Sequence, residues 1–339
     1  MAETFQGLVL NETDRGVPTA TVQALSTDWL MPGDVLVAVQ YSDLNYKDGL
    51  ALLGKNKVVR QYPMIPGIDF VGTVADSRSP LWKSGDQVIL TGWGVGERHH
   101  GGFAQMAQVK GEWLVPLPKG LAPLQAMALG TAGLTAMLCV LALEQQNLKR
   151  GRPVLVTGAA GGVGSVATWL LAQRGYIVHA STGRQEEAAY LKRLGAEAVI
   201  PRLQSNSRPL EREAWGGAVD TVGGETLAAL ISQLSYGCSV AACGLAGGSA
   251  LHTSVIPFIL RGVRLLGVDS VQCPVELRTQ AWNELAQAVK QDPETVDEMS
   301  QVVALEDVVK LAPLILQGQI RGRTVVDVHA PSEEGLMTK

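Results

Sequence analysis

The sequence predicts an α/β protein in which a doubly wound parallel sheet is inserted into a second, β-rich domain. Three observations support this fold class. The first third of the chain holds short β-branched and apolar segments separated by Pro/Gly turns. Strand-like and helix-like segments then alternate, which is the order that builds a parallel sheet with helices on both faces. A glycine-rich turn joins the first strand of this series to its first helix.

The β-rich part shows its pattern best in three segments bounded by turn residues, Asp34–Gln40, Phe70–Val74 and Gln87–Leu90. The segment Trp93–Gly102 (WGVGERHHGG) is bracketed by glycines and carries several polar residues. We expect it to be a flexible loop outside the core.

The pattern changes near Pro123, where helical periodicity begins. It appears in Leu124–Leu129 and Leu134–Leu143, and so apolar a helix has to be buried. The alternating series follows, with strands at Val154–Val156, Ile177–Ala180, Ala198–Ile200, Ala218–Thr221, Ser239–Cys243 and Leu265–Asp269 and helices at Gly162–Gln173, Glu186–Leu194 and Thr226–Leu234. The chain then continues through helices at Pro274–Gln291 and Ala304–Gln317 to a last strand, Thr324–Val328. We therefore expect one domain from residues 126–270 and a discontinuous one from 1–125 and 271–339.

The composition is that of a globular protein without affinity for polyanions. Apolar residues make up 46% of the chain and charged residues 18%, the net charge is −4, and the isoelectric point is near 5.8. The four cysteines form no C-x-x-C pair, which indicates reduced thiols. The N-terminus does not resemble a secretory signal, and no apolar run approaches the roughly 20 residues that a membrane helix needs. We expect a cytoplasmic protein with neither a nucleic-acid nor a membrane partner.

The glycine-rich turn has the spacing of a dinucleotide site. It reads A-x-G-x-x-G at Ala159, Gly161 and Gly164, between an apolar strand and an apolar helix. Glycines let the backbone approach a pyrophosphate, which the N–H groups and the dipole of the helix N-terminus bind. The alternative is an ordinary turn, but the strand before it and the helix after it favour a cofactor site formed by Ala160, Gly161, Gly162 and Val163.

The end of the second strand predicts NADPH as the cofactor. An NAD site carries Asp or Glu there for the ribose hydroxyls, whereas this chain has no acid before Glu186. Ser181 and Thr182 offer hydroxyls to a 2′-phosphate, and Arg184, after Gly183, offers a forked cation. Alone, Arg184 would be interpreted as a solvated residue at a helix start. Together with the missing acid it favours NADPH.

Longer strings of residues carry a family resemblance that covers nearly the whole chain. Pro66–Gly72 (PGIDFVG), Gly85–Val88 (GDQV) and Gly130–Ala136 (GTAGLTA), with the Ala159–Gly164 turn, resemble the medium-chain dehydrogenase/reductase superfamily. More specific strings are similar to its acrylyl-CoA reductase group, often labelled putative quinone oxidoreductase: Asn45–Asp48 (NYKD), Thr91–Glu97 (TGWGVGE), Ala242–Gly248 (ACGLAGG) and Gly267–Ser270 (GVDS). The resemblance implies a Rossmann domain inserted into a GroES-like catalytic domain. It also implies a homodimer, and the apolar edge strand expected at Val263–Asp269 needs a partner.

The same resemblance implies site residues that the sequence alone does not select. It places Asn45 and Tyr46 beside the nicotinamide as candidate catalytic residues. Tyr46 would donate its phenolic proton to the enolate or thioester oxygen, or would only pack against the cofactor. Related enoyl reductases carry a tyrosine further along, where this chain has Lys55 and Asn56, so water is an alternative proton donor. The remaining implied cofactor contacts are Thr135, Arg202, Leu245, Ile259 and Ser270.

The resemblance also predicts that no zinc is bound. Zinc-dependent relatives have Cys, His and Cys ligands where this chain has Asn45, Ile68 and Thr131, and an amide, an alkyl chain and a hydroxyl do not form a catalytic zinc site. Asp69, at the position of a glutamate in the zinc enzymes, is interpreted as a structural carboxylate. Glu97 with His99 and His100 is the other set of possible donors, which we expect to be solvated.

Without a Lewis acid, conjugated alkenes and quinones are the natural hydride acceptors, because they delocalise the added charge. The resemblance implies 2-enoyl thioesters as substrates, and the expected reaction is NADPH-dependent reduction of acryloyl-CoA to propanoyl-CoA, with hydride transfer to the β-carbon. The alternatives are a quinone or alkenal reductase and, in another class, a non-catalytic NADPH-binding regulator. The loop Gly54–Arg60 offers Lys55, Lys57 and Arg60 to the phosphates of CoA, and the alternative is a solvated loop.

Overall fold

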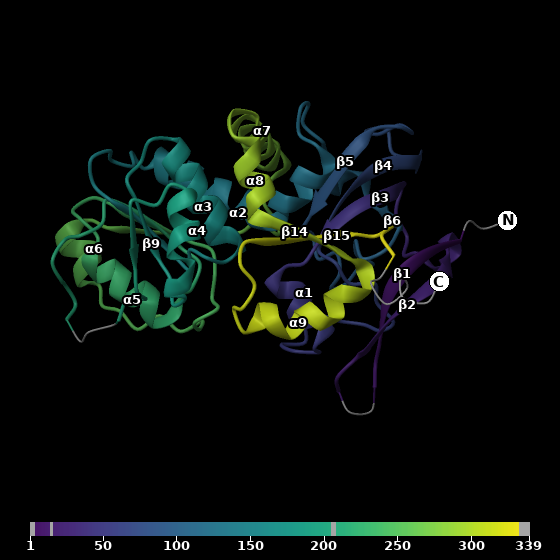
Figure 1. The fold of residues 1–339 in the computed structure, drawn as a ribbon, viewed down its shortest axis with the longest axis horizontal. Coiled ribbons are helices and arrows are strands. Elements are labelled where there is room, and N and C mark those ends of the chain that lie inside the picture. Colours follow the sequence, from purple (N-terminus) through teal and green to yellow (C-terminus); the bar gives the residue numbers. More distant parts are fainter. Residues whose placement is uncertain (1–3, 14–15, 205–207, 332–339) are drawn as a thin grey trace. The chain divides into compact units, whose positions relative to one another are not determined.

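The computed structural model describes residues 4–13, 16–204 and 208–331 (Figure 1). The chain divides into two compact units, Met1–Thr131 with Val271–Lys339 (unit 1) and Ala132–Ser270 (unit 2). The first boundary falls inside helix α2 (Pro123–Gln145), a few residues beyond the expected one at 125/126. The second falls between Ser270 and Val271.

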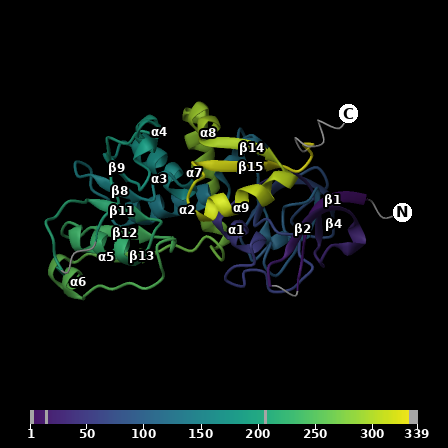
Figure 2. The ribbon, with the colours of Figure 1, turned by 60° about the horizontal axis from the view of Figure 1, so that its bottom comes forward.

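Unit 2 contains a six-stranded parallel sheet of order β10-β9-β8-β11-β12-β13. In Figure 2 the labels β9, β8, β11, β12 and β13 follow one another in this spatial order. Its strands are β8 (Val154–Thr157), β9 (Val178–Ser181), β10 (Ala198–Ile200), β11 (Gly217–Asp220), β12 (Ser239–Ala242) and β13 (Arg264–Gly267). The chain winds outward from β8 to β10 and then returns to β11 on the other side. The order reverses between β8 and β11, the topological switch point at which α/β sheets bind ligands. The predicted doubly wound sheet is confirmed.

The helices of unit 2 follow the strands. They are α3 (Gly162–Gln173), α4 (Ala188–Arg193), α5 (Gly224–Gln233) and α6 (Ile256–Arg261). Helix α3 has the predicted bounds and is buried from Gly164 to Leu171, as expected of a helix that is apolar all round. The helix expected at Glu186–Leu194 begins instead with a 3-10 turn, Gln185–Glu187. Helix α6 was not predicted.

Unit 1 is built on a seven-stranded sheet of order β14-β15-β3-β4-β5-β7, with β6 paired to β3, and on a separate β1–β2 pair. The strands are β1 (Thr4–Asn11), β2 (Thr19–Ser26), β3 (Val35–Asp43), β4 (Asp69–Ser77), β5 (Gln87–Thr91), β6 (Met106–Val109), β7 (Val115–Pro116), β14 (Ser300–Ala304) and β15 (Arg323–Asp327). All neighbours in this sheet are antiparallel except β14 and β15. The pairing of β15 with β3 brings the end of the described chain next to Asp43.

Among the described residues of unit 1, the helices that lie wholly within it are α1 (Tyr46–Leu52), α7 (Val275–Gln291), α8 (Pro293–Met299) and α9 (Val308–Leu316). The sequence did not predict α1, which is short and contains Gly49. That glycine is required because a Cβ there would lie 2.7 Å from Cγ2 of Ile315 on α9. The close packing of α9 therefore stabilises α1.

Helix α2 corrects the expectation that no apolar run approaches membrane-spanning length. The two predicted segments form one 23-residue element with a kink at Gly130 (φ 51°, ψ −151°). It is long and apolar enough to cross a membrane, and it alone is so in the described part of the chain. However, 89% of its most apolar stretch is buried within the protein, as predicted for a core helix.

Candidate active site

The turn between β8 and α3 fits a pyrophosphate. Helix α3 begins after Gly161 with no side-chain cap, so the N–H groups of Gly162, Val163 and Gly164 have no partner within the helix. A Cβ on Gly164 would lie 2.3 Å from the carbonyl oxygen of Gly158, whereas one on Gly161 would meet only that oxygen, at 3.3 Å. These glycines therefore have no side chain that covers their backbone N–H groups, where a phosphate would approach the helix N-terminus.

The end of β9 places its polar groups beside this turn. The guanidinium of Arg184 donates to the carbonyl of Ala160 at 2.9 Å, which joins the two loops. The hydroxyl of Thr182 accepts the N–H of Arg184 at 3.0 Å and keeps its own proton for another acceptor. The hydroxyl of Ser181 donates to the carbonyl of Pro201 at 3.1 Å.

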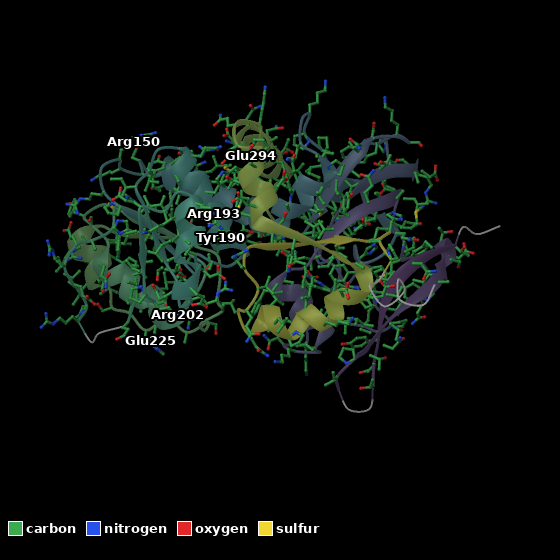
Figure 3. All side chains as sticks on the ribbon, in the orientation of Figure 1. Arg150, Tyr190, Arg193, Arg202, Glu225 and Glu294 are labelled. Carbon is green, nitrogen blue, oxygen red and sulfur yellow. The ribbon has the colours of Figure 1, made fainter. Side chains whose placement is uncertain are left out.

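Arg202 lies in the loop after β10, and its side chain approaches Gly183 in the turn after β9 (Figure 3 labels Arg202). A Cβ on Gly183 would lie 2.5 Å from its Nε, so the glycine leaves room for this side chain. Arg202 is exposed. The guanidinium of Arg202 therefore lies beside Gly183, the residue before Arg184, and two arginines near one turn suit a doubly charged phosphate.

The other cofactor residues implied by the resemblance lie in two environments. Thr135 on α2 donates to the hydroxyl of Ser270 at 2.9 Å, so the structure brings these two together. Leu245, which follows β12, and Ile259 on α6 are 63% and 72% exposed. Of these two, Leu245 contacts the glycine turn after β11, where a Cβ on Gly223 would lie 3.2 Å from its Cα.

In unit 1, Tyr46 is the first residue of α1 and is 42% exposed, so its phenol is accessible. One short helix separates it from the loop that carries Lys55, Lys57 and Arg60, all three of them exposed. A helix of that length rises about 10 Å. Asn56 and Lys57 both have left-handed backbone (φ 56° and 49°), an uncommon conformation for residues other than glycine.

Asn45 lies in a buried polar cluster that precedes α1. Its side-chain amide donates to Asp43 Oδ1 at 2.7 Å and to Asp69 Oδ2 at 3.0 Å. Its carbonyl oxygen accepts from Arg323 at 3.2 Å. Asp69 also accepts from the backbone N–H and the hydroxyl of Thr131, at 2.6 and 2.5 Å. We call Asp43, Asn45, Asp69, Thr131 and Arg323 the Arg323 cluster.

Burial changes the ionisation of two carboxyls here. Burial and the charge of Asp69 raise the pKa of Asp43 well above its usual range, against the opposing effect of Arg323. Burial also raises the pKa of Asp48 to about 7. Asp48 accepts the backbone N–H groups of Asn45 at 2.9 Å and Ile68 at 3.0 Å, and so holds the start of α1 against β4.

The residues at the zinc-ligand positions do not fit a zinc ion. Both N–H bonds of the Asn45 amide go to carboxylates, the Thr131 hydroxyl donates to Asp69, and Ile68 has no donor atom. Within residues 4–13, 16–204 and 208–331, no group of three or more His, Cys, Asp or Glu side chains could hold a metal.

His99 and His100 correct the expectation of a solvated glycine loop, since both are buried. The ring of His99 bonds to the carbonyl of Gln108 at 2.7 Å, and that of His100 stacks on Trp29 at 4.5 Å. Burial lowers the pKa of His100 to about 4 and also lowers the pKa of His99. The loop packs inward because its glycines allow close approach: a Cβ on Gly101 would lie 2.2 Å from the carbonyl oxygen of Gly67.

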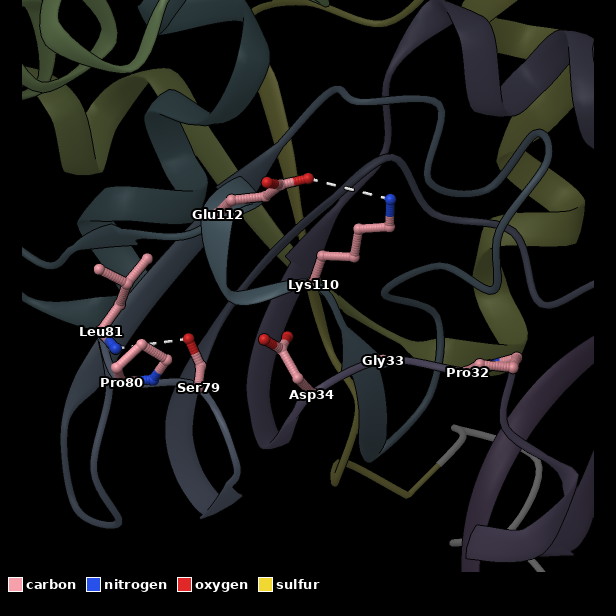
Figure 4. Close-up of a pocket in the computed structure, with 8 residues that line it drawn as sticks. All are labelled: Pro32, Gly33, Asp34, Ser79, Pro80, Leu81, Lys110 and Glu112. Carbon is pink, nitrogen blue, oxygen red and sulfur yellow. Dashed lines mark hydrogen bonds and ion pairs between the residues drawn. The ribbon is translucent and has the colours of Figure 1, made fainter.

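Unit 1 also has a surface depression, which Figure 4 shows with the residues that line it. The turns 32–34 and 79–81 line it, together with Lys110 and Glu112. These two side chains form an exposed ion pair at 3.9 Å, which stabilises little. None of the predicted site residues lines this depression.

Comparison with known proteins identifies the family. The alcohol dehydrogenase GroES-like domain model matches residues 31–119, and the zinc-binding dehydrogenase model matches 162–291. Acrylyl-CoA reductase AcuI of Ruegeria pomeroyi is 53% identical over 331 residues, which cover 96% of this chain and all of that protein. The chain belongs to the medium-chain dehydrogenase/reductase superfamily. The predicted family and fold class are thereby confirmed.

Two further members of the superfamily are informative about cofactors. The Escherichia coli K-12 protein YhdH, solved with bound NADPH, is 51% identical, with a TM-score of 0.93 over 96% of this chain and 100% of that one. The putative quinone oxidoreductase YhfP of Bacillus subtilis is 45% identical over 96% of this chain and 99% of that protein. Its structure, with a TM-score of 0.92 over 96% of this chain and 100% of that one, has NAD bound.

Arg323, Asp43 and Asp48 were missed by the sequence analysis as members of the site. Asp48 appeared there only as part of a family string. Arg323 opens a strand that is buried from Arg323 to Val326, and a charged residue at a buried strand end is a signal that could have drawn attention to it.

Proposed function

We propose that this protein is an NADPH-dependent reductase of activated C=C bonds, and that its substrate is acryloyl-CoA, which it converts to propanoyl-CoA. The observation that carries this proposal is the 53% identity, over 96% of this chain, to a protein named acrylyl-CoA reductase. The geometry agrees, because an uncapped helix N-terminus and two arginines suit a phosphorylated dinucleotide.

The residues have the following roles in this proposal. The N–H groups at the start of α3 bind the pyrophosphate, and Thr182, Arg184 and Arg202 bind the 2′-phosphate. NADPH supplies the hydride when it is bound. Tyr46 donates its phenolic hydrogen bond to the thioester oxygen, on which negative charge develops. Because the amide of Asn45 is already engaged by three buried partners, Asn45 positions Tyr46 rather than contacting substrate.

The test is the oxidation of NADPH, followed by its absorbance, with acryloyl-CoA, with a small quinone, and with no acceptor. Fast turnover of acryloyl-CoA with propanoyl-CoA as product is the expected result. The second candidate is a quinone reductase, which the 45% identity to YhfP favours; turnover of the quinone alone would support it. NADPH binding without turnover of either acceptor would indicate a non-catalytic regulator.

Cofactor preference is expected to depend on Arg184. Replacing it with alanine removes a charge-assisted contact to the 2′-phosphate and should raise the KM for NADPH about ten- to a hundredfold. The KM for NADH should barely change, because NADH lacks this phosphate. Steady-state kinetics with both cofactors check this. Equal losses on both would mean that Arg184 serves only to hold the Ala160 turn.

The exposed cations after α1 are expected to bind the phosphates of CoA. In the double variant Lys55→Gln/Lys57→Gln the KM for acryloyl-CoA should rise about tenfold, from the loss of two surface charge contacts. Reduction of a small quinone should stay nearly unchanged, since it carries no phosphate. The matched control is Lys83→Gln/Lys119→Gln, which removes two exposed lysines of the same unit. An equal effect of both double variants would refute a CoA site on this loop.

The protein is further proposed to be a cytoplasmic homodimer that pairs through β13. This strand is the edge of the six-stranded sheet, and Leu265 on it is 38% exposed. Leu260 on α6 adds an apolar side chain that is 62% exposed. Pairing of two such edges about a two-fold axis continues the sheet and covers these side chains. Light scattering at micromolar concentration measures the mass, and a monomer would contradict the proposal.

A further inference from the structure

The Arg323 cluster is a buried set of charges. Asp43 and Asp69 are fully buried, Arg323 is 3% exposed, and Asn45 is 7% exposed. Charged side chains are rarely buried to this extent unless they are paired and hydrogen-bonded. A purely apolar replacement would pack as well in most cores, so the arrangement calls for a specific explanation.

Each of the three guanidinium nitrogens of Arg323 donates a hydrogen bond. Nη2 pairs with Asp43 Oδ2, Nη1 donates to the Asn45 carbonyl oxygen at 3.2 Å, and Nε donates to the backbone carbonyl of Ala128 at 3.0 Å. The guanidinium is planar and rigid, so bonding to three acceptors at once fixes the position of each acceptor. An ammonium group carries the same charge on a single atom and does not reach all three.

The cluster holds two carboxyl groups, those of Asp43 and Asp69, and one cation, Arg323. Burial first, and then the charge of Asp69, raises the pKa of Asp43, whereas Arg323 lowers it. The positive charge that opposes the cost of burying these carboxyl groups is therefore that of Arg323.

The cluster continues directly into the proposed catalytic residue. Asn45 is the N-cap of α1, and Tyr46 is the next residue. With its amide bonded to Asp43, Asp69 and Arg323, Asn45 has no freedom to rotate, and the first turn of α1 is fixed with it. We propose that Arg323 is a positioning residue of the reductase site, which orients the Asn45 amide and through it Tyr46. This inference rests on the proposed function.

The first experiment compares Arg323→Lys with the wild type. The charge is retained but the fork is lost, so kcat should fall about ten- to a hundredfold while the KM for NADPH stays within about twofold. The matched control is Arg78→Lys in the same unit, whose exposed guanidinium donates to the carbonyl of Gly33 at 2.7 Å. An Arg323→Lys variant with the kcat of the wild type would overturn the proposal.

A second pair of variants separates positioning from stability. Arg323→Gln leaves the buried Asp43 without its cation and should lower the unfolding temperature, whereas Asp43→Asn/Arg323→Gln removes both partners of this ion pair and should restore it. We expect kcat of the double variant to stay reduced, because Asn45 still lacks its arginine. Recovery of both the unfolding temperature and kcat would mean that Arg323 acts only on stability, and the inference would fail.

Hydrogen–deuterium exchange gives a readout that does not depend on turnover. In Arg323→Lys the amides of the first turn of α1 should exchange about tenfold faster than in the wild type, while those of α7 should be unchanged. A wild type that reduces neither acryloyl-CoA nor quinone would refute the proposed function alone. Unchanged exchange in α1 would refute the positioning role whatever the activity.

Discussion

Gly130→Ala is expected to prevent folding of unit 1 or to reduce its free energy of unfolding by more than about 4 kcal/mol. A Cβ at this position would lie 1.7 Å from Oδ2 of Asp43 and 2.9 Å from Nη2 of Arg323. Its backbone, at φ 51° and ψ −151°, is also in a region that L residues rarely adopt. Neither neighbour can move away, because both are buried and bonded within the Arg323 cluster.

Urea unfolding followed by circular dichroism measures this effect. The matched control is Gly120→Ala in the same unit, where φ is +86° and nothing lies within 4 Å of an added Cβ. It should lose only about 1–2 kcal/mol, the strain of a left-handed backbone. If both variants lose the same amount, the tight packing of α2 on the Arg323 cluster is refuted.

Gly164→Ala is expected to weaken NADPH binding about a hundredfold, through the loss of charge-assisted bonds from displaced N–H groups. The added Cβ would lie 2.3 Å from the carbonyl oxygen of Gly158 and 2.7 Å from Cα of Ala159, so the turn must open. Titration of NADPH fluorescence gives the Kd, and far-ultraviolet circular dichroism verifies that the variant is folded.

Gly161→Ala provides the comparison. Its Cβ would meet only the oxygen of Gly158, at 3.3 Å, and its backbone, at φ −85°, suits any residue. We expect a stable protein whose Kd for NADPH rises about tenfold, because the methyl group occupies space above the turn. An unchanged Kd in Gly164→Ala would mean that the cofactor phosphates bind elsewhere.

The parts of the fold that depend on local pattern could be predicted from the sequence. The strand β8, the glycine turn and α3 follow one another within 20 residues, and the periodicity of α3 gave its bounds correctly. The element α1 was missed because Gly49 and a length of seven residues oppose an isolated helix. It forms because α9, more than 250 residues later, packs against it.

The candidate site divides in the same way. The cofactor side lies on neighbouring loops of one sheet, so spacing along the chain predicted Thr182 and Arg184, and the structure joins the Arg184 turn to Ala160. The Arg323 cluster depends on a pairing between β3 and β15, and Asp43 and Arg323 are 280 positions apart in the sequence. No local pattern in the sequence contains information about such a pairing. The burial of His99 could not be predicted either, because a glycine-rich loop can be exposed or closely packed.

The origin of Arg323 in β15 has a consequence for how the chain is synthesised. Unit 2 is one continuous segment, Ala132–Ser270, and has its full sequence as soon as it leaves the ribosome. The aspartates Asp43 and Asp69 are made before unit 2, but Arg323, which pairs with Asp43, is made after it. A nascent chain that stops before β15 therefore has these carboxyl groups without that cation, and their burial is then unfavourable. The proposed catalytic centre can thus be completed only after the whole of unit 2 has been synthesised.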